Sequence, residues 1–160
     1  TERIVRLVQP GEVNFIQGDA LNITQECKRI NNIISKINID VAFVGIGENG
    51  HLAFNDPPAD FEIKDPYIVV YLVEKCRMQQ VREGWFKSIE EVPKKAISMS
   101  IQEIMRSRNI ICTCPDERKA QAVKFCLSKD TKITPMHPAS ILKSHFNVYC
   151  YLDKFSAKLL

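Results

Sequence analysis

The chain has 160 residues, 45% of them hydrophobic and 26% charged, which suits one domain with a sizeable buried core. Its formal net charge is only +3, and the basic residues are scattered without a lysine/arginine block, so we expect no nucleic-acid partner. No apolar run reaches the about 18 residues that cross a bilayer, and the charged residues 1–7 do not resemble a signal peptide. We therefore expect a cytoplasmic protein with no membrane partner.

Short apolar runs alternate along the chain with stretches of helical spacing. The predicted strands are residues 13–16, 41–46, 68–73, 96–99, 109–114 and 148–152. The predicted helices are residues 23–37, 74–82, 101–106 and 116–127, with a short helix opening at Pro138. This alternation predicts a single α/β domain over residues 1–160, with a doubly wound, mostly parallel, Rossmann-like sheet and helices on both faces. Ligands of such sheets bind beyond the carboxyl ends of the strands.

The six cysteines form no C-x-x-C pair, and the three histidines do not lie at the spacings of known metal sites. We therefore expect cysteines that are mostly buried as small apolar side chains in a reducing cytosol, and no metal site.

The most informative stretch is the loop of residues 45–57, GIGENGHLAFNDP, which follows an apolar predicted strand. Its three glycines let the backbone turn sharply and approach a ligand closely. His51 comes just after this turn, with Asn49 two residues before it and Asp56 five residues after it. A histidine with polar partners can transfer protons near neutral pH, although a histidine that only hydrogen-bonds its own loop would have the same pattern.

The same loop resembles the G-x-G-x-[DN]-G-H-x-[AG]-F-N-E-P signature of the glucosamine-6-phosphate deaminase family, and the resemblance extends over about residues 18–152. Members of this family convert glucosamine 6-phosphate and water to fructose 6-phosphate and ammonia, without a redox cofactor or a metal. The resemblance therefore implies an amino-sugar phosphate as the small-molecule substrate and a doubly wound α/β fold.

The resemblance also implies roles for individual residues of the loop. His51 matches the family's ring-opening histidine, which moves a proton between the ring oxygen and the anomeric hydroxyl. Asn49 matches a position that is aspartate or asparagine, and its carbonyl oxygen is expected to orient the imidazole. Asp56 matches a glutamate that supports the histidine. Because aspartate is one methylene shorter, we expect either a closer backbone or a bridging water.

Four further positions are predicted to bind substrate. Lys119 matches the family's phosphate-binding lysine, and Arg82 aligns with a phosphate-binding arginine. Gly47 and Gly50 are expected to let the backbone approach the sugar phosphate. Residues 58–64 lack the arginine-lysine pattern with which allosteric members bind an amino-sugar effector, so we expect no such regulation through this segment.

The resemblance begins partway along the family fold, so the predicted domain is incomplete at its N-terminal side. Two elements of the family, a phosphate-binding glycine/threonine turn and the aspartate that moves a proton between C1 and C2, have no counterpart in residues 1–40. Asp19 and Asp40 are acidic, but their surroundings do not match. We therefore expect little or no activity from the chain alone, and an exposed sheet edge that favours a homo-oligomer.

Three alternatives remain open. A 6-phosphogluconolactonase-like hydrolase shares the glycine-rich core, but it typically continues with S-L-F-P, so residues 52–57 favour the deaminase. A sugar-phosphate-binding module without turnover would explain the missing base, and a plain interaction domain would leave the His51 loop unexplained. The sequence does not decide between glucosamine and galactosamine.

Overall fold

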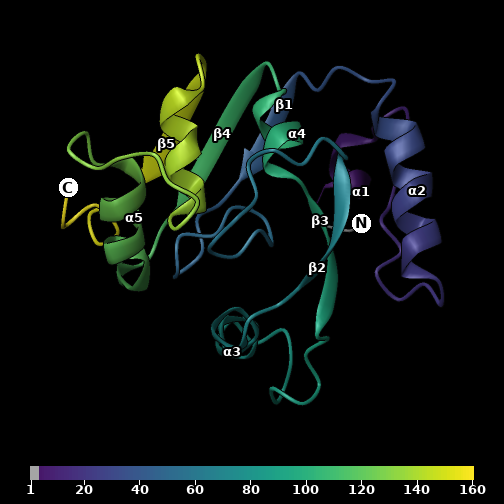
Figure 1. Cartoon of the computed structure of the whole chain (residues 1–160), viewed down its shortest axis with the longest axis horizontal. Coiled ribbons are helices and arrows are strands. Elements are labelled where there is room, and N and C mark those ends of the chain that lie inside the picture. The colour runs from purple at the N-terminus through teal and green to yellow at the C-terminus, as the bar shows by residue number, and fades with distance from the viewer. Residues whose placement is uncertain (1–3) are drawn as a thin grey trace.

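The centre of the fold is a parallel sheet with the strand order β1-β4-β5, in a computed structural model that describes residues 4–160 (Figure 1). Strand β1 spans Val41–Val44, β4 spans Asn109–Cys114 and β5 spans Val148–Leu152. The register pairs Phe43 with Ile111 and Ile111 with Tyr149. These three strands and their parallel pairing confirm the predicted α/β class.

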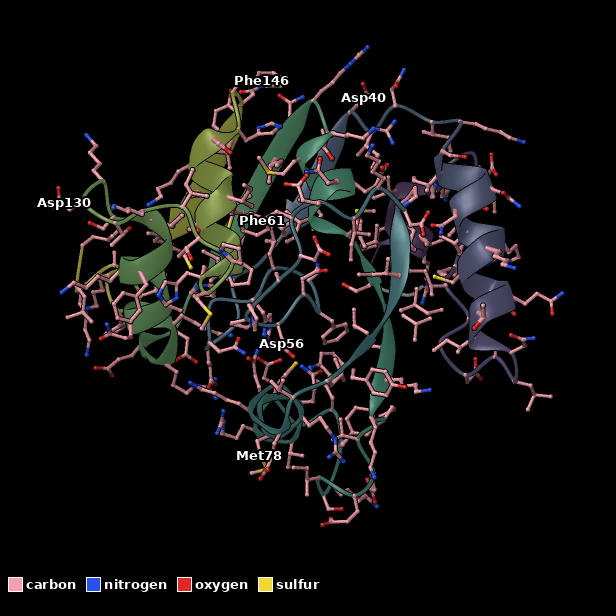
Figure 2. The ribbon with its side chains drawn as sticks, in the orientation of Figure 1. Asp40, Asp56, Phe61, Met78, Asp130 and Phe146 are labelled. Atoms are coloured by element: carbon pink, nitrogen blue, oxygen red, sulfur yellow. The ribbon has the colours of Figure 1, made fainter. Side chains whose placement is uncertain are left out.

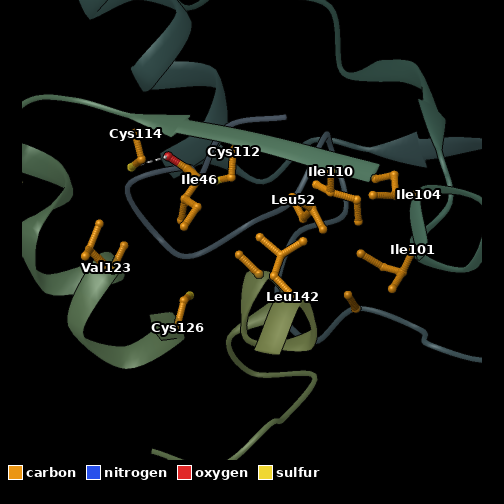
Figure 3. Packing of buried hydrophobic residues seen from close by; sticks show 13 residues of the cluster. Ile46, Leu52, Ile101, Ile104, Ile110, Cys112, Cys114, Val123, Cys126 and Leu142 are labelled. Carbon is orange, nitrogen blue, oxygen red and sulfur yellow. Dashed lines mark hydrogen bonds between the residues drawn. The ribbon is translucent and has the colours of Figure 1, made fainter. Parts of the chain in front are cut away.

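One face of this sheet carries the hydrophobic core. Alternate residues of β4, including Ile110 and Cys112, point into it because successive strand side chains face opposite sides. They pack against side chains of α4 (Ile101–Met105), α5 (Ala120–Leu127) and the 3-10 helix η2 (Pro138–Ser144). Figure 3 shows Leu52 and Ile46 of the His51 loop inside the same cluster. The loop is therefore anchored by the core.

The other face of the parallel sheet is open in the described part of the chain. Phe43 is 78% exposed in the middle of β1, and Tyr149 and Tyr151 of β5 are 52% and 60% exposed. The free edge of β1 adjoins this face, since β4 is the strand paired with β1 in the described residues. An apolar face and an unpaired strand edge are both surfaces that other polypeptide segments can cover.

A second, antiparallel pair of strands lies beside the parallel sheet. It joins β2 (Tyr67–Tyr71) to β3 (Lys95–Met99), with Val69 opposite Ile97. Helix α2 (Ile23–Ile34) packs on β2, and α3 (Glu74–Arg82) lies between the two strands in the sequence (Figure 1). The sequence predicted both strands and both helices, but not that β2 and β3 form a separate antiparallel pair.

The N-terminal region differs from the prediction. Residues 5–8 form a short helix, α1 (Val5–Val8), and the strand predicted at residues 13–16 is wrong because this segment is irregular. It is tied to α2 instead, where Arg29 donates to the Phe15 carbonyl oxygen and Glu26 accepts from the Gln17 backbone N–H. An apolar run becomes a strand only where another strand offers hydrogen-bond partners, and none of the described residues does so here.

The predicted helix 116–127 begins as a 3-10 turn, η1 (Glu117–Lys119), which continues directly into α5. Five of the six cysteines are buried as predicted, and Cys150 is exposed on β5. Within residues 4–160, the helices are too short or too polar to cross a membrane.

Candidate active site

The His51 loop closes tightly after β1. The backbone N–H of Gly47 donates to the carbonyl oxygen of His51 at 3.0 Å, and the N–H of Gly50 donates to the carbonyl oxygen of Gly47 at 2.9 Å. Gly50 has a φ of +84°, a left-handed conformation that favours glycine. On either side of the turn, Ile46 and Leu52 form a bridge and are buried. The packed ends therefore hold His51 beyond the carboxyl end of a parallel strand.

Gly47 is required by the position of the His51 ring. A Cβ atom at residue 47 would lie 2.2 Å from His51 Nε2, closer than any real contact. The imidazole thus lies directly against the Gly47 backbone. The sequence predicted a close approach of this backbone to a ligand, and the structure shows a close approach to the ring itself.

The ring of His51 also faces Asp56. His51 Nδ1 lies 3.3 Å from Asp56 Oδ1, and the side chains are only 8% and 7% exposed. Asn49 Nδ2 donates to the same Oδ1 at 2.9 Å, while Asn49 Oδ1 accepts from the backbone N–H of His51 at 3.2 Å. Asn49 therefore positions Asp56 and the loop backbone. The prediction was that its carbonyl oxygen orients the imidazole, but this oxygen accepts from the His51 backbone N–H instead. Although aspartate is one methylene shorter than glutamate, its carboxylate lies within contact distance of the imidazole.

The charge of Asp56 is supported by its surroundings. Burial pushes its pKa upward, but His51, Asn49 and the backbone N–H of Val73 together bring the pKa of this carboxyl below its ordinary value. The Val73 N–H donates to Oδ2 at 3.2 Å, so both carboxylate oxygens have a partner. Asp56 is thus an anion held in one orientation beside the ring.

A cleft of about 490 Å³ opens beside this ring, between the loop, α3 and the residues that follow β4. His51 and Gly47 line one wall, and Lys119 lines another. Lys119 is largely buried, and its Nζ lies 3.9 Å from Glu83 Oε1. The structure therefore brings the His51 imidazole and the Lys119 ammonium group to one cleft, at the carboxyl ends of two parallel strands.

Two predicted substrate residues do not line this cleft. Arg82 Nη2 contacts Glu48 Oε2 at 2.5 Å and is held outside it. Gly50 uses its backbone within the protein, because its carbonyl oxygen accepts from the Ala139 N–H. Arg82 could bind a phosphate in the cleft only if its ion pair with Glu48 were broken.

Several residues around the cleft were not predicted from the sequence. Arg118 lines it and lies 3.6 Å from Glu48 Oε1. Gln79 donates to Glu83 at 2.7 Å and accepts from the Glu48 backbone N–H. Cys76, Gln79 and Glu83 are spaced by three and four residues, so one face of the predicted helix 74–82 was the signal that could have identified them.

Asp19 and Asp40, the two acidic residues of the N-terminal part that were compared with the family's proton-transfer aspartate, lie away from the cleft. Asp40 precedes the amino end of β1 and pairs with Arg108 at 2.9 Å, so it lies at the end of the sheet opposite to Asp56 (Figure 2). Asp19 lies in the exposed N-terminal segment and does not line the cleft. Neither is placed to act on a ligand beside His51.

Comparison with known proteins connects this site to one family. No family model matches the chain. It is 40% identical over 149 residues to a glucosamine-6-phosphate deaminase of Clostridium acetobutylicum, a match that covers 92% of this chain and 59% of the relative. A relative of the same description from Lactobacillus delbrueckii is 37% identical over 143 residues. The chain thus spans well under two thirds of these relatives' length.

Solved structures agree with these matches. A monomeric glucosamine-6-phosphate deaminase of the NagB superfamily superposes with a TM-score of 0.81 at 35% identity, covering 89% of this chain and 57% of that one. A 6-phosphogluconolactonase from Trypanosoma brucei superposes with a TM-score of 0.65 at 20% identity, which shows a shared fold only. Over 92% of its residues, this chain is therefore similar to part of a glucosamine-6-phosphate deaminase, of which it spans 59%.

Proposed function

We propose that this chain supplies the ring-opening part of a glucosamine-6-phosphate deaminase site, which converts glucosamine 6-phosphate and water to fructose 6-phosphate and ammonia. The observation that carries the proposal is the His51 ring, held against Asp56 in the wall of a cleft that also contains Lys119. An acid/base group and a cation facing one cavity suit a phosphorylated sugar.

In this proposal Asp56 orients the imidazole through Nδ1, and Nε2 is the atom that exchanges the proton. Nε2 lies against the cleft-lining Gly47, so a sugar ring bound in the cleft can reach it. The oriented ring takes the proton of the anomeric hydroxyl and returns one to the ring oxygen, which opens the pyranose. Asp56 stabilises the imidazolium that forms between these two transfers.

Lys119 is proposed to hold the phosphate, with Arg118 at the rim. Both cations already face carboxylates, Glu83 and Glu48 respectively. A dianionic phosphate attracts Lys119 more strongly than one carboxylate 3.9 Å away does, so binding should replace the Glu83 contact. Arg82 would join only by releasing Glu48.

The remaining step, proton transfer between C1 and C2, needs a base over the sugar's C2 carbon. Asp19 and Asp40 lie outside the cleft, and the two carboxylates that line it, Glu83 and Asp116, face the cations Lys119 and Arg118. We propose that this base belongs to the part of the relatives that the chain does not match, and that the chain alone binds the sugar phosphate with little or no turnover.

The test compares the chain alone with the chain fused to the unmatched part of the Clostridium acetobutylicum relative. Ammonia release and fructose 6-phosphate are measured from glucosamine 6-phosphate, with 6-phosphogluconolactone hydrolysis in parallel. We expect deaminase activity from the fusion only, and its loss in His51→Gln but not in His137→Gln, a histidine that stacks on Phe125. Turnover by the chain alone at an enzyme's usual rate of about 1–1,000 per second would contradict the proposed division. Lactone hydrolysis exceeding ammonia release would contradict the deaminase itself.

Binding is measured separately, because a fusion can fail for reasons of folding. Calorimetry of the isolated chain with glucosamine 6-phosphate should show weaker binding in Lys119→Ala than in Lys124→Ala, a lysine on the next turn of α5 that does not line the cleft. Equal affinities of the two variants would remove Lys119 from the phosphate site.

A further inference from the structure

Two side chains of the loop that follows β1 meet a third side chain from α3. A ring nitrogen of His51, a carboxylate oxygen of Asp56 and Cys76 Sγ all lie within 4.8 Å of one another. His51 and Asp56 come from the loop of residues 45–57, and Cys76 comes from α3. An imidazole nitrogen, a carboxylate oxygen and a sulfur are the three ligand types that bind Zn²⁺ in proteins.

One of the histidine's ring nitrogens is buried and makes no hydrogen bond. His51 Nδ1 is buried and makes no hydrogen bond of normal geometry, although Asp56 Oδ1 is 3.3 Å away. A buried nitrogen without a hydrogen bond costs free energy, which a bound cation would recover. The His51 side chain is 8% exposed, so this nitrogen lies away from solvent.

The distances suit a tetrahedral ion. Bonds of about 2.1 Å from Zn²⁺ to nitrogen and oxygen place those two atoms about 3.4 Å apart in a tetrahedron. The observed His51–Asp56 separation of 3.3 Å already matches this value. Cys76 is only 1% exposed, and its sulfur lies within 4.8 Å of both other ligand atoms, compared with about 3.6 Å in a tetrahedral site.

The surroundings support the carboxylate ligand. Asn49 and the Val73 N–H donate to Asp56 and fix its orientation, as hydrogen-bond partners around metal ligands do. A sulfur ligand favours ions that bind thiolate strongly over Mg²⁺ or Ca²⁺.

We propose that His51, Asp56 and Cys76 form a binding site for one thiophilic divalent cation of the Zn²⁺ class. Three protein ligands leave a fourth position for water. A cation on Nδ1 leaves the ring's one proton on Nε2. It also takes the position between His51 and Asp56 that a hydrogen bond would otherwise occupy. The bound ion would thus block the proton transfer of His51, a consequence that rests on the function proposed above, whereas cation binding itself does not.

The test uses the reduced full chain and two probes, Zn²⁺ by calorimetry and Co²⁺ by absorption. Cys150→Ser serves as the background, because it removes the exposed thiol that could bind ions on its own. We expect one equivalent of Zn²⁺ and a near-ultraviolet thiolate-to-cobalt band in this background. Cys76→Ala should abolish the band and weaken Zn²⁺ binding by at least the roughly 10–100-fold that loss of an outer partner costs.

Other outcomes would overturn the proposal. These are a folded Cys150→Ser chain without a thiolate band, a band that persists in Cys76→Ala, or Mg²⁺ binding as tightly as Zn²⁺. If Cys76→Ala does not fold, as judged by circular dichroism, Asp56→Asn replaces it and must weaken Zn²⁺ binding by a similar factor. In the fused enzyme, Zn²⁺ binding without inhibition would leave the cation site standing and count against the role of His51.

Discussion

The two faces of the parallel sheet are built from alternate residues of the same strands, yet they differ in burial. Ile110 of β4 is 0% exposed, whereas Phe43 of the neighbouring β1 is 78% exposed on the opposite side. The packed face holds both ends of the His51 loop through Ile46 and Leu52. The packed core therefore fixes the position of His51 within this chain. The opposite face of the sheet, within the described residues, is an exposed apolar surface.

The largest expected effect is on the packed face. Ile110→Ala removes a fully buried side chain among neighbours that cannot collapse into the space, so the free energy of unfolding should fall by about 2–5 kcal/mol. Urea unfolding followed by circular dichroism measures it. A loss below 1 kcal/mol would mean that the two faces do not differ as their burial indicates.

The next effect concerns the loop that the packed face supports. Gly47→Ala places a Cβ atom 2.2 Å from His51 Nε2, so the ring must move. Displacement of a catalytic group by about 1 Å can cost about 100-fold in rate, and we expect a loss of this size in kcat/KM of the fused enzyme. Gly18→Ala is the matched control, since a Cβ there meets nothing within 4 Å. Equal activities of the two variants would show that the ring tolerates displacement.

The next prediction compares the response to acid of the packed core and of the N-terminal segment. This segment is held to α2 by hydrogen bonds to the charged side chains of Glu26 and Arg29. The hydrogen bonds from Arg29 and from the Gln17 backbone lower the pKa of Glu26 to about 2. Because this folded-state pKa lies below the unfolded value of about 4.3, the contribution of Glu26 to stability is present above that pH and is lost as the pH falls toward 2.

Glu26→Gln should therefore lower the free energy of unfolding at neutral pH, and its difference from the unmodified chain should vanish in acid. Urea unfolding between pH 7 and pH 2 measures this, with the exposed Glu62→Gln as control. A difference that stays constant over this range would show that the effect of Glu26 is not one of charge.

The smallest effect is expected on the open face. Phe43→Ala should change the free energy of unfolding of the isolated chain by no more than about 0.5 kcal/mol, because the ring already lies in solvent. Urea unfolding of this variant beside Ile110→Ala gives the contrast directly. A loss of 2 kcal/mol would indicate that another copy of the chain covers Phe43 in solution, which sedimentation at several concentrations would detect.

Much of the fold followed from local pattern. The strand at 109–114 and the helix at 74–82 were predicted at the observed residues, because a continuous apolar run and helical spacing are properties of neighbouring residues. The strand predicted at 13–16 was wrong for the converse reason, since a strand depends on a partner elsewhere in the chain. The antiparallel pairing of β2 with β3 was likewise beyond local pattern.

For the site, the glycine-rich turn, the histidine after it and the resemblance to the deaminases could be read from the sequence alone, because they lie within one short stretch. Three contacts depend on the tertiary structure. Asp56 lies against His51, Arg82 pairs with Glu48, and Cys76 lies within 4.8 Å of a His51 ring nitrogen. The physical reason is that hydrogen bonds, ion pairs and metal sites depend on distances of a few ångströms between side chains. Those distances are set where separate segments pack together, and not by their spacing along the chain.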